Sequence, residues 1–152
     1  MKKIVPKDVD VFEGFTFSSH GKNYHIMGVS LFTTNQTGED QWYLFFVEEG
    51  KDGVIPYVMR PKDMESIGLV NINRISSPHP DSPCVGSVYS HYKGKSYQVT
   101  NVPYSPFEGR WFVVYEPLYK EAIADSFIRI LEDFTTLIPG EDTSVPRFAL
   151  AA

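Results

Sequence analysis

Polar and apolar residues alternate in two short runs in the C-terminal part of the chain. Ser87–Tyr92 and Ser96–Thr100 each alternate with a period of two, which is typical of a strand with one buried face. Gly94 lies between them, and a glycine between two alternating runs predicts a β-hairpin. A third run, Arg110–Tyr115, is apolar after its first residue, which predicts a strand buried on both faces.

The N-terminal part repeats these signals in the same order. Expected strands are Phe15–Phe17, Tyr24–Val29 and Trp42–Val47, with a turn around Gly21. The matched pairs are Gly21 with Gly94, 73 positions apart (94 − 21), and Trp42 with Trp111 and Arg60 with Arg129, both 69 positions apart (111 − 42 and 129 − 60). A recurring ordered set of signals predicts two tandem copies of one small module.

The segment from Tyr119 to Phe134 is open to two interpretations. Its apolar residues recur at spacings of three and four, as in an amphipathic helix: Tyr119, Ala122, Ile123, Ser126, Phe127, Ile130, Leu131 and Phe134. The equivalent stretch of the first copy contains Pro56 and Pro61, which forbid an uninterrupted helix. If the copies are homologous, Phe127–Ile130 is a strand and Leu131–Phe134 a short helical turn, and we favour this reading.

A proline-rich segment, residues 76–83, separates the two copies. Its prolines hold the backbone extended and cannot donate ladder hydrogen bonds. We therefore expect a first copy at residues 1–75, called the first half below, and a second copy at residues 84–152, called the second half.

Composition and charge exclude several classes of protein. The 152 residues are 42% hydrophobic and 14% aromatic, with a formal net charge of −5. No clustered basic surface is evident, which disfavours nucleic acid as a partner. Cys84 is the only cysteine, so an intrachain disulfide is excluded. No run approaches the roughly 20 apolar residues that span a bilayer, and we expect a soluble, cytoplasmic protein.

The second half resembles a bacterial family known only as domain of unknown function 1653. The matching residues are Tyr89–Lys95, Tyr97–Val99, Val113–Tyr115, Leu118–Tyr119, Phe127–Arg129, Leu131–Glu132 with Phe134, and Val145–Phe148. The first half is similar to a lesser extent, mainly through Gly21–Tyr24, Arg60–Pro61 and Met64. The resemblance implies a small Src-homology-3-like β-barrel and no assigned activity. The expected fold is therefore mainly β, with two tandem barrels of this kind and short helical turns.

Candidate ligand-binding residues gather in the second half. Histidine titrates near neutrality, tyrosines with a wet hydroxyl are common at binding surfaces, and arginine anchors anionic groups. The candidates are His91, Tyr92, Lys93, Tyr97, Tyr104, Tyr115 and Arg129. The alternative is structural. It expects a solvated strand edge at His91–Lys93 and, for Arg60 and Arg129, a pair with a carboxylate such as Glu116 or Glu132 or hydrogen bonds to loop carbonyls. His79, Asp81 and Cys84 lack the spacing of metal ligands, and neither a metal nor a cofactor is predicted.

These residues are compatible with three hypotheses about function. The leading hypothesis is a non-enzymatic binding module that recognises a peptide segment or small ligand through an aromatic groove, placed between the two copies. The second is sequestration of an anionic metabolite or signalling nucleotide by Lys93, Lys95 and Arg129. The third is a cofactor-free enzyme with His91 as general base. The partner and the oligomeric state are not indicated.

Overall fold

A computed structural model of the chain describes residues 5–32, 41–50, 55–73, 75, 77–139 and 144–150. In chain order the elements are α1 (Lys7–Asp10), β1 (Thr16–Ser19), β2 (Lys22–Phe32), β3 (Gln41–Glu48), β4 (Tyr57–Met59), the 3-10 helix η1 (Pro61–Leu69), β5 (Val88–His91), β6 (Ser96–Asn101), β7 (Tyr104–Ser105), β8 (Arg110–Pro117), β9 (Phe127–Ile130), α2 (Leu131–Phe134), β10 (Leu137–Pro139), β11 (Ser144–Pro146) and β12 (Phe148–Leu150). The fold is mainly β. None of the helices in these residues is long and apolar enough to cross a membrane.

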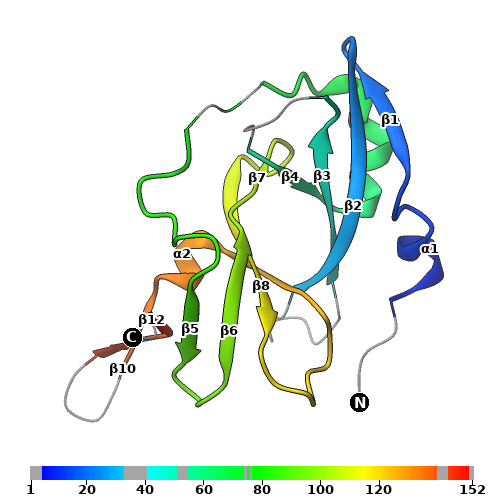
Figure 1. The fold of residues 1–152 in the computed structure, drawn as a ribbon. Helices are drawn as coiled ribbons and strands as arrows, with labels where there is room; N and C mark the ends of the chain where they lie inside the picture. Colours follow the sequence, from blue (N-terminus) through cyan, green and yellow to red (C-terminus); the bar gives the residue numbers. More distant parts are fainter. Residues whose placement is uncertain are drawn as a thin grey trace.

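Strands from both halves join in one ten-stranded sheet. The hydrogen-bonded order is β1-β2-β3-β4-β7-β8-β6-β5-β12, and β9 pairs with both β2 and β8. The pairings of β2, β3, β4, β7, β8 and β9 therefore close on themselves, and Figure 1 shows these strands arranged as a ring. Two tandem Src-homology-3-like barrels are not confirmed, because the expected modules are not separate sheets.

Two parallel contacts close the ring, and both join one half to the other. Tyr57 of β4 lies opposite Tyr104 of β7, and Leu31 of β2 lies opposite Phe127 of β9. The adjoining amides continue each contact: the Leu31 N–H donates to the Ser126 carbonyl at 2.9 Å, and the Tyr104 N–H to the Pro56 carbonyl at 3.1 Å. All other paired strands in the ring run antiparallel.

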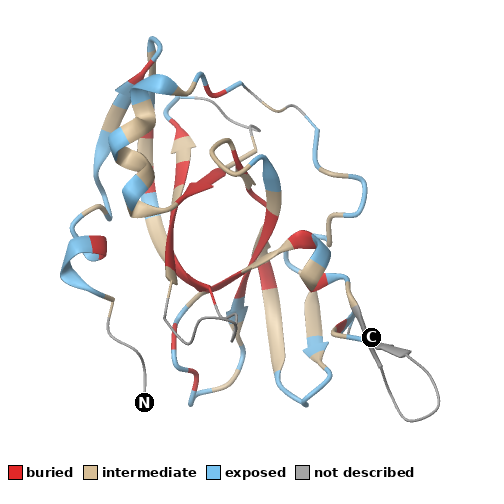
Figure 2. Cartoon of the chain, turned by 180° about the vertical axis from the view of Figure 1, so that it is seen from behind, coloured by how far each residue is buried: buried red, intermediate tan, exposed pale blue. Residues whose placement is uncertain are grey.

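The largest hydrophobic cluster draws on both halves. Tyr24 and Leu44 of the first half are in the same cluster as Val113, Tyr115 and Phe148 of the second, and each is less than a tenth exposed. Figure 2 shows that the buried positions lie along the strands of the ring. The burial of these side chains against one another supplies the main favourable free energy of folding, and the two halves share it.

Local elements follow the sequence expectations closely. The hairpin forms as β5 and β6, and Gly94 supplies its turn with a φ of +101°. Phe127–Ile130 is a strand and Leu131–Phe134 a helical turn, as favoured, so the alternative of one long helix is wrong. Residues 77–83 contain neither helix nor strand, which suits a connecting segment, but its role as a domain boundary stays a prediction.

Candidate functional site

Four of the seven predicted site residues come together where β5, β6, β8 and β9 meet. The Tyr97 ring lies edge-on to Tyr115 at 5.2 Å and to His91 at 6.5 Å between centroids. The Arg129 Nε donates to the Tyr115 hydroxyl at 3.4 Å. Phe148 of β12 completes this cluster, 5.0 Å from the His91 ring and 5.8 Å from the Arg129 guanidinium carbon.

His91 is a weak base in this setting. Burial, followed by the charges of Arg129, Arg147 and Lys93, lowers its pKa to about 4. Its Nδ1 accepts a hydrogen bond from the Lys93 backbone N–H at 3.2 Å. Because a general base works best with a pKa near the operating pH, this environment does not favour the hypothesis of an enzyme that uses His91.

Of the three remaining predicted residues, Tyr92 and Lys93 border the cluster and Tyr104 lies away from it, since the Tyr92 ring is 4.5 Å from the His91 ring. Tyr92 is 44% exposed, and the Lys93 ammonium lies over its ring at 5.7 Å. Tyr104 belongs to the opposite end of β8, where its ring packs against Trp111 at 5.3 Å. The seven residues therefore do not line one common surface.

The tyrosines of the cluster are engaged within the protein. Tyr115 is only 2% exposed, and the Tyr97 hydroxyl is hydrogen-bonded to the Tyr119 hydroxyl at 2.9 Å. Burial, and then the contact with Tyr119, raises the pKa of Tyr97. The Tyr97 and Tyr115 rings pack against each other and against Phe127 and Phe148.

Arg60 and Arg129 both use a tyrosine as partner. Arg60 Nε donates to the Tyr43 hydroxyl at 3.2 Å, and one of its terminal nitrogens lies 3.7 Å from a Glu108 carboxylate oxygen. Burial raises the pKa of Tyr43 to about 12. Among the described residues, neither Glu116 nor Glu132 forms an ion pair with Arg129. No sequence pattern indicated these tyrosine partners.

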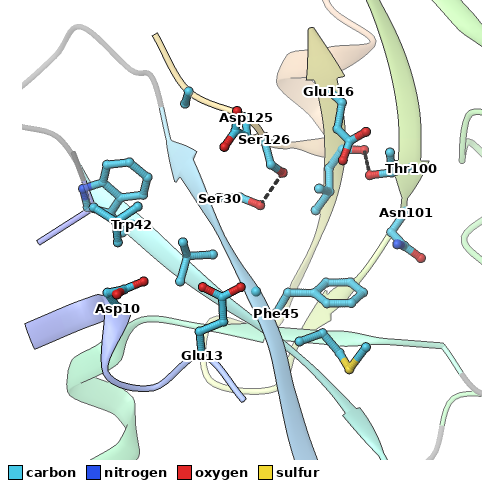
Figure 3. Close-up of a pocket in the computed structure, with 16 residues that line it drawn as sticks. Asp10, Glu13, Ser30, Trp42, Phe45, Thr100, Asn101, Glu116, Asp125 and Ser126 are labelled. Carbon is cyan, nitrogen blue, oxygen red and sulfur yellow. Dashed lines mark hydrogen bonds between the residues drawn. The ribbon is translucent and has the colours of Figure 1, made fainter. Parts of the chain in front are cut away.

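A pocket of about 530 Å³ lies between the halves, away from the His91 cluster. The first half contributes residues of α1, β2 and β3, and the second contributes residues of β6, β8 and the segment before β9 (Figure 3). The lining residues are Val5, Asp10, Glu13, Met27, Gly28, Val29, Ser30, Trp42, Phe45, Thr100, Asn101, Val114, Glu116, Ala124, Asp125 and Ser126. None of the seven predicted site residues is among them.

The pocket combines aromatic, hydroxyl and acidic groups. Ser30 and Ser126 share a hydrogen bond of 2.7 Å across the parallel contact of β2 with β9, and Figure 3 shows this pair at the centre of the view. Trp42 and Phe45 of β3 supply the rings. Among the described lining residues none is lysine, arginine or histidine. Four of them carry carboxylates: Asp10, Glu13, Glu116 and Asp125.

A second pocket, of about 460 Å³, lies beside the proline-rich segment. Four prolines contribute to its wall: Pro56, Pro78, Pro80 and Pro83. Ser82 Oγ is buried there without a hydrogen bond to any described residue. The pocket's other polar lining residues are His79 and Asn101.

No short motif in the sequence marks the 530 Å³ pocket. Its residues come from six separate stretches of chain, and the parallel contact of β2 with β9 is what brings them together. The spacing of the acidic residues in the sequence indicates no more than solvated faces. Only the expectation of a groove between the two halves pointed toward this pocket.

The comparisons with known proteins concern the second half. Residues 87–150 match a family described as "Protein of unknown function (DUF1653)". A crystal structure of a protein from Bordetella bronchiseptica that belongs to this family is similar over 44% of this chain and 86% of that one, with 28% identity and a TM-score of 0.41. No curated protein matches the chain.

Proposed function

We propose that this protein is a non-enzymatic binding module whose ligand site is the 530 Å³ pocket between the halves. The single observation behind the proposal is that both halves build this pocket, around the Ser30–Ser126 hydrogen bond. Its volume falls within the range of roughly 300–1,000 Å³ that is usual for small-molecule sites. A small ligand, or a side chain of a peptide segment, fits a pocket of this size.

The wall of the pocket has the mixed chemistry of a binding site. Ligand sites combine apolar and aromatic area with a few polar groups that fix orientation. Here Trp42 and Phe45 supply ring surface, while Ser30, Ser126 and Thr100 supply hydroxyl groups. A binding function needs no paired acid and base, in keeping with the weak basicity of His91.

A ligand screen with a blocked pocket tests the proposal. Gly28 lies in the pocket wall, and a Cβ atom added there meets no heavy atom within 4 Å. A leucine at position 28 therefore has room for its Cβ atom, and we expect the rest of its side chain to narrow the pocket. We expect a library of anionic, neutral and cationic metabolites and short peptides to give saturable amide shifts around Ser30 and Ser126 in NMR spectra, and we expect Gly28→Leu to abolish them.

The matched control is Gly68→Leu. Gly68 also has open space for a Cβ atom and is outside the pocket, so this variant should retain every hit. Hits that are unaffected by Gly28→Leu, or that shift residues around His91 and Arg129 instead, would refute the pocket as the ligand site.

A second candidate function, sequestration of an anionic metabolite or nucleotide, rests on the His91 cluster. Arg129, Arg147 and Lys93 all act on the pKa of His91, so positive charge converges there. The Lys95 ammonium lies 4.8 Å from the centre of the Tyr119 ring nearby. An anion bound at this place would raise the pKa of His91, and NMR titration with inorganic phosphate or nucleoside monophosphates would detect the shift. An unchanged pKa would remove this candidate.

We also propose that the halves are divergent copies of one Src-homology-3-like module that exchange strands. Two features support this. The strand that follows the Trp42 strand pairs in parallel with the second half, and the strand that follows the Trp111 strand pairs in parallel with the first. Leu31 lies opposite Trp42 as Tyr104 lies opposite Trp111. A structure of a family member with a single copy, paired as a dimer in the same way, would support this origin; a single copy closed on itself would count against the exchange.

A further inference from the structure

We infer that the pocket takes an organic cation, an ammonium or guanidinium group carried on an apolar body. This inference rests on the proposed function, because it names the ligand class of the same site. Three properties of the pocket carry it: the sign of the charges around it, the aromatic wall of β3, and the apolar residues at its outer rim.

The carboxylates surround the pocket from both halves. Asp10 and Glu13 lie at α1 and the turn that follows it, whereas Glu116 lies on β8. Figure 3 shows the first two on one side of the Ser30–Ser126 pair and Glu116 on the other. Asp125 already takes part in an interaction within the protein, so the argument uses the other three.

Charge of one sign around a cleft favours a ligand of the opposite sign. Carboxylates on different sides attract a bound cation together, and the field also raises the local concentration of cations. The same carboxylates would repel an anionic ligand, and no described basic side chain in the wall offsets this repulsion. The charge therefore selects against the anionic compounds that suit the His91 cluster.

Trp42 and Phe45 add an attraction that a neutral ligand would not share. The face of an indole ring attracts ammonium and guanidinium groups within about 6 Å of its centroid. Trp42 is 8% exposed and lies in the pocket wall. A cation bound in this pocket would therefore have an indole ring in its wall.

The outer rim explains the apolar body of the ligand. Met27 lines the pocket and is 51% exposed, and Val5 and Val29 also line it. Apolar side chains in a pocket wall are where a ligand buries apolar surface. A cation in the pocket with an apolar group on this rim satisfies both features.

Three probes of the same shape and different charge test the inference: 2-phenylethylamine, 2-phenylethanol and 3-phenylpropionate. The readout is the dissociation constant of each probe, measured by NMR titration of the full chain. We expect the amine to bind at least about tenfold more tightly than the alcohol and the carboxylate to bind most weakly. Glu13→Gln and Glu116→Gln should each weaken the amine by about two- to fivefold, as for exposed ion pairs, and leave the alcohol unchanged.

The matched control for the charge is Glu65→Gln, an exposed glutamate on η1 outside the pocket. It should leave all three dissociation constants unchanged. Raising the salt concentration from about 50 to 500 mM should weaken the amine, relieve the repulsion of the carboxylate and leave the alcohol unchanged, because the Debye length shortens severalfold.

The outcomes separate the inference from the proposed function. If the alcohol or the carboxylate binds as tightly as the amine, and Gly28→Leu still abolishes binding, the pocket is a ligand site but not a cation site. If Gly28→Leu changes nothing for any probe that binds, or no compound in the screen or probe set binds at the pocket, the proposed function fails as well. A blocked Phe-Lys dipeptide in a fourth titration distinguishes a peptide side chain from a free amine as the source of the cation.

Discussion

The shared core predicts that the two halves unfold together, and Ile128 tests this most directly. Ile128 is fully buried on β9 and lies opposite Phe32 of β2 as well as Val114 of β8. Truncation to alanine removes three carbons, about 2.4 kcal/mol at ~0.8 kcal/mol for each buried CH₂. The cavity left behind adds roughly 1 kcal/mol, for a total of about 3–4 kcal/mol.

The two tryptophans report on the two halves separately. Trp42 is on β3 of the first half and Trp111 is on β8 of the second. In single-tryptophan variants made with phenylalanine, urea unfolding followed by fluorescence should give one common midpoint. With a denaturant slope of about 2 kcal/mol/M, Ile128→Ala should lower that midpoint by about 1.5–2 M for both reporters.

Independent barrels would behave differently. If the Trp42 midpoint stayed in place while the Trp111 midpoint fell, the halves would be separate folding units and the argument from the ring of strands would be refuted. Leu118→Ala is the control, because Leu118 is 52% exposed and its truncation should change stability by less than about 0.5 kcal/mol.

Three further predictions concern single side chains. Burial first, and then neighbouring cations, lowers the pKa of His91 from 6.5 to about 4, so the folded state resists protonation. The free energy of unfolding should keep its full value above pH 6.5 and decrease by about 1–2 kcal/mol as the pH falls from 6.5 to about 4, after allowance for the partly exposed ring. Urea unfolding of His91→Gln at successive pH values should not show this decrease. Gly94→Ala should cost about 1–2 kcal/mol in urea unfolding because its φ is positive, whereas Gly28→Ala should not destabilise. Glu108→Gln removes the carboxylate beside Arg60 and should cost about 1 kcal/mol, less at high salt; an equal cost at every salt concentration would contradict the ion pair.

Local structure was predictable where a pattern within one segment determines it. The hairpin around Gly94 follows from neighbouring residues. The short helix after Ile130 does not, because the local spacing indicated a longer helix and only the match to the stretch with Pro56 and Pro61 corrected it. Both parallel contacts were beyond such reasoning. Leu31 and Phe127 are far apart in sequence and meet over a two-residue ladder, which leaves no periodic signal.

The candidate site, too, could be predicted from the sequence only in part. Titratable or charged residues such as His91 and Arg129 stand out in the sequence, and the structure places these two in a packed cluster. The pocket instead uses Ser30, Glu13 and Glu116, which are ordinary residues made relevant only by their neighbours in space. Predicting them from sequence would have required knowledge of which strands of the two halves pair with each other.

The closure of the ring by β9 limits how the protein can be divided. A fragment that ends at residue 83 would lose both parallel partners and leave the edges of β2 and β4 unpaired. Unpaired edges recruit strands from other molecules. Expression of either half alone should therefore yield aggregates or swapped assemblies, and the two halves produced together should recover a soluble product by pairing with each other.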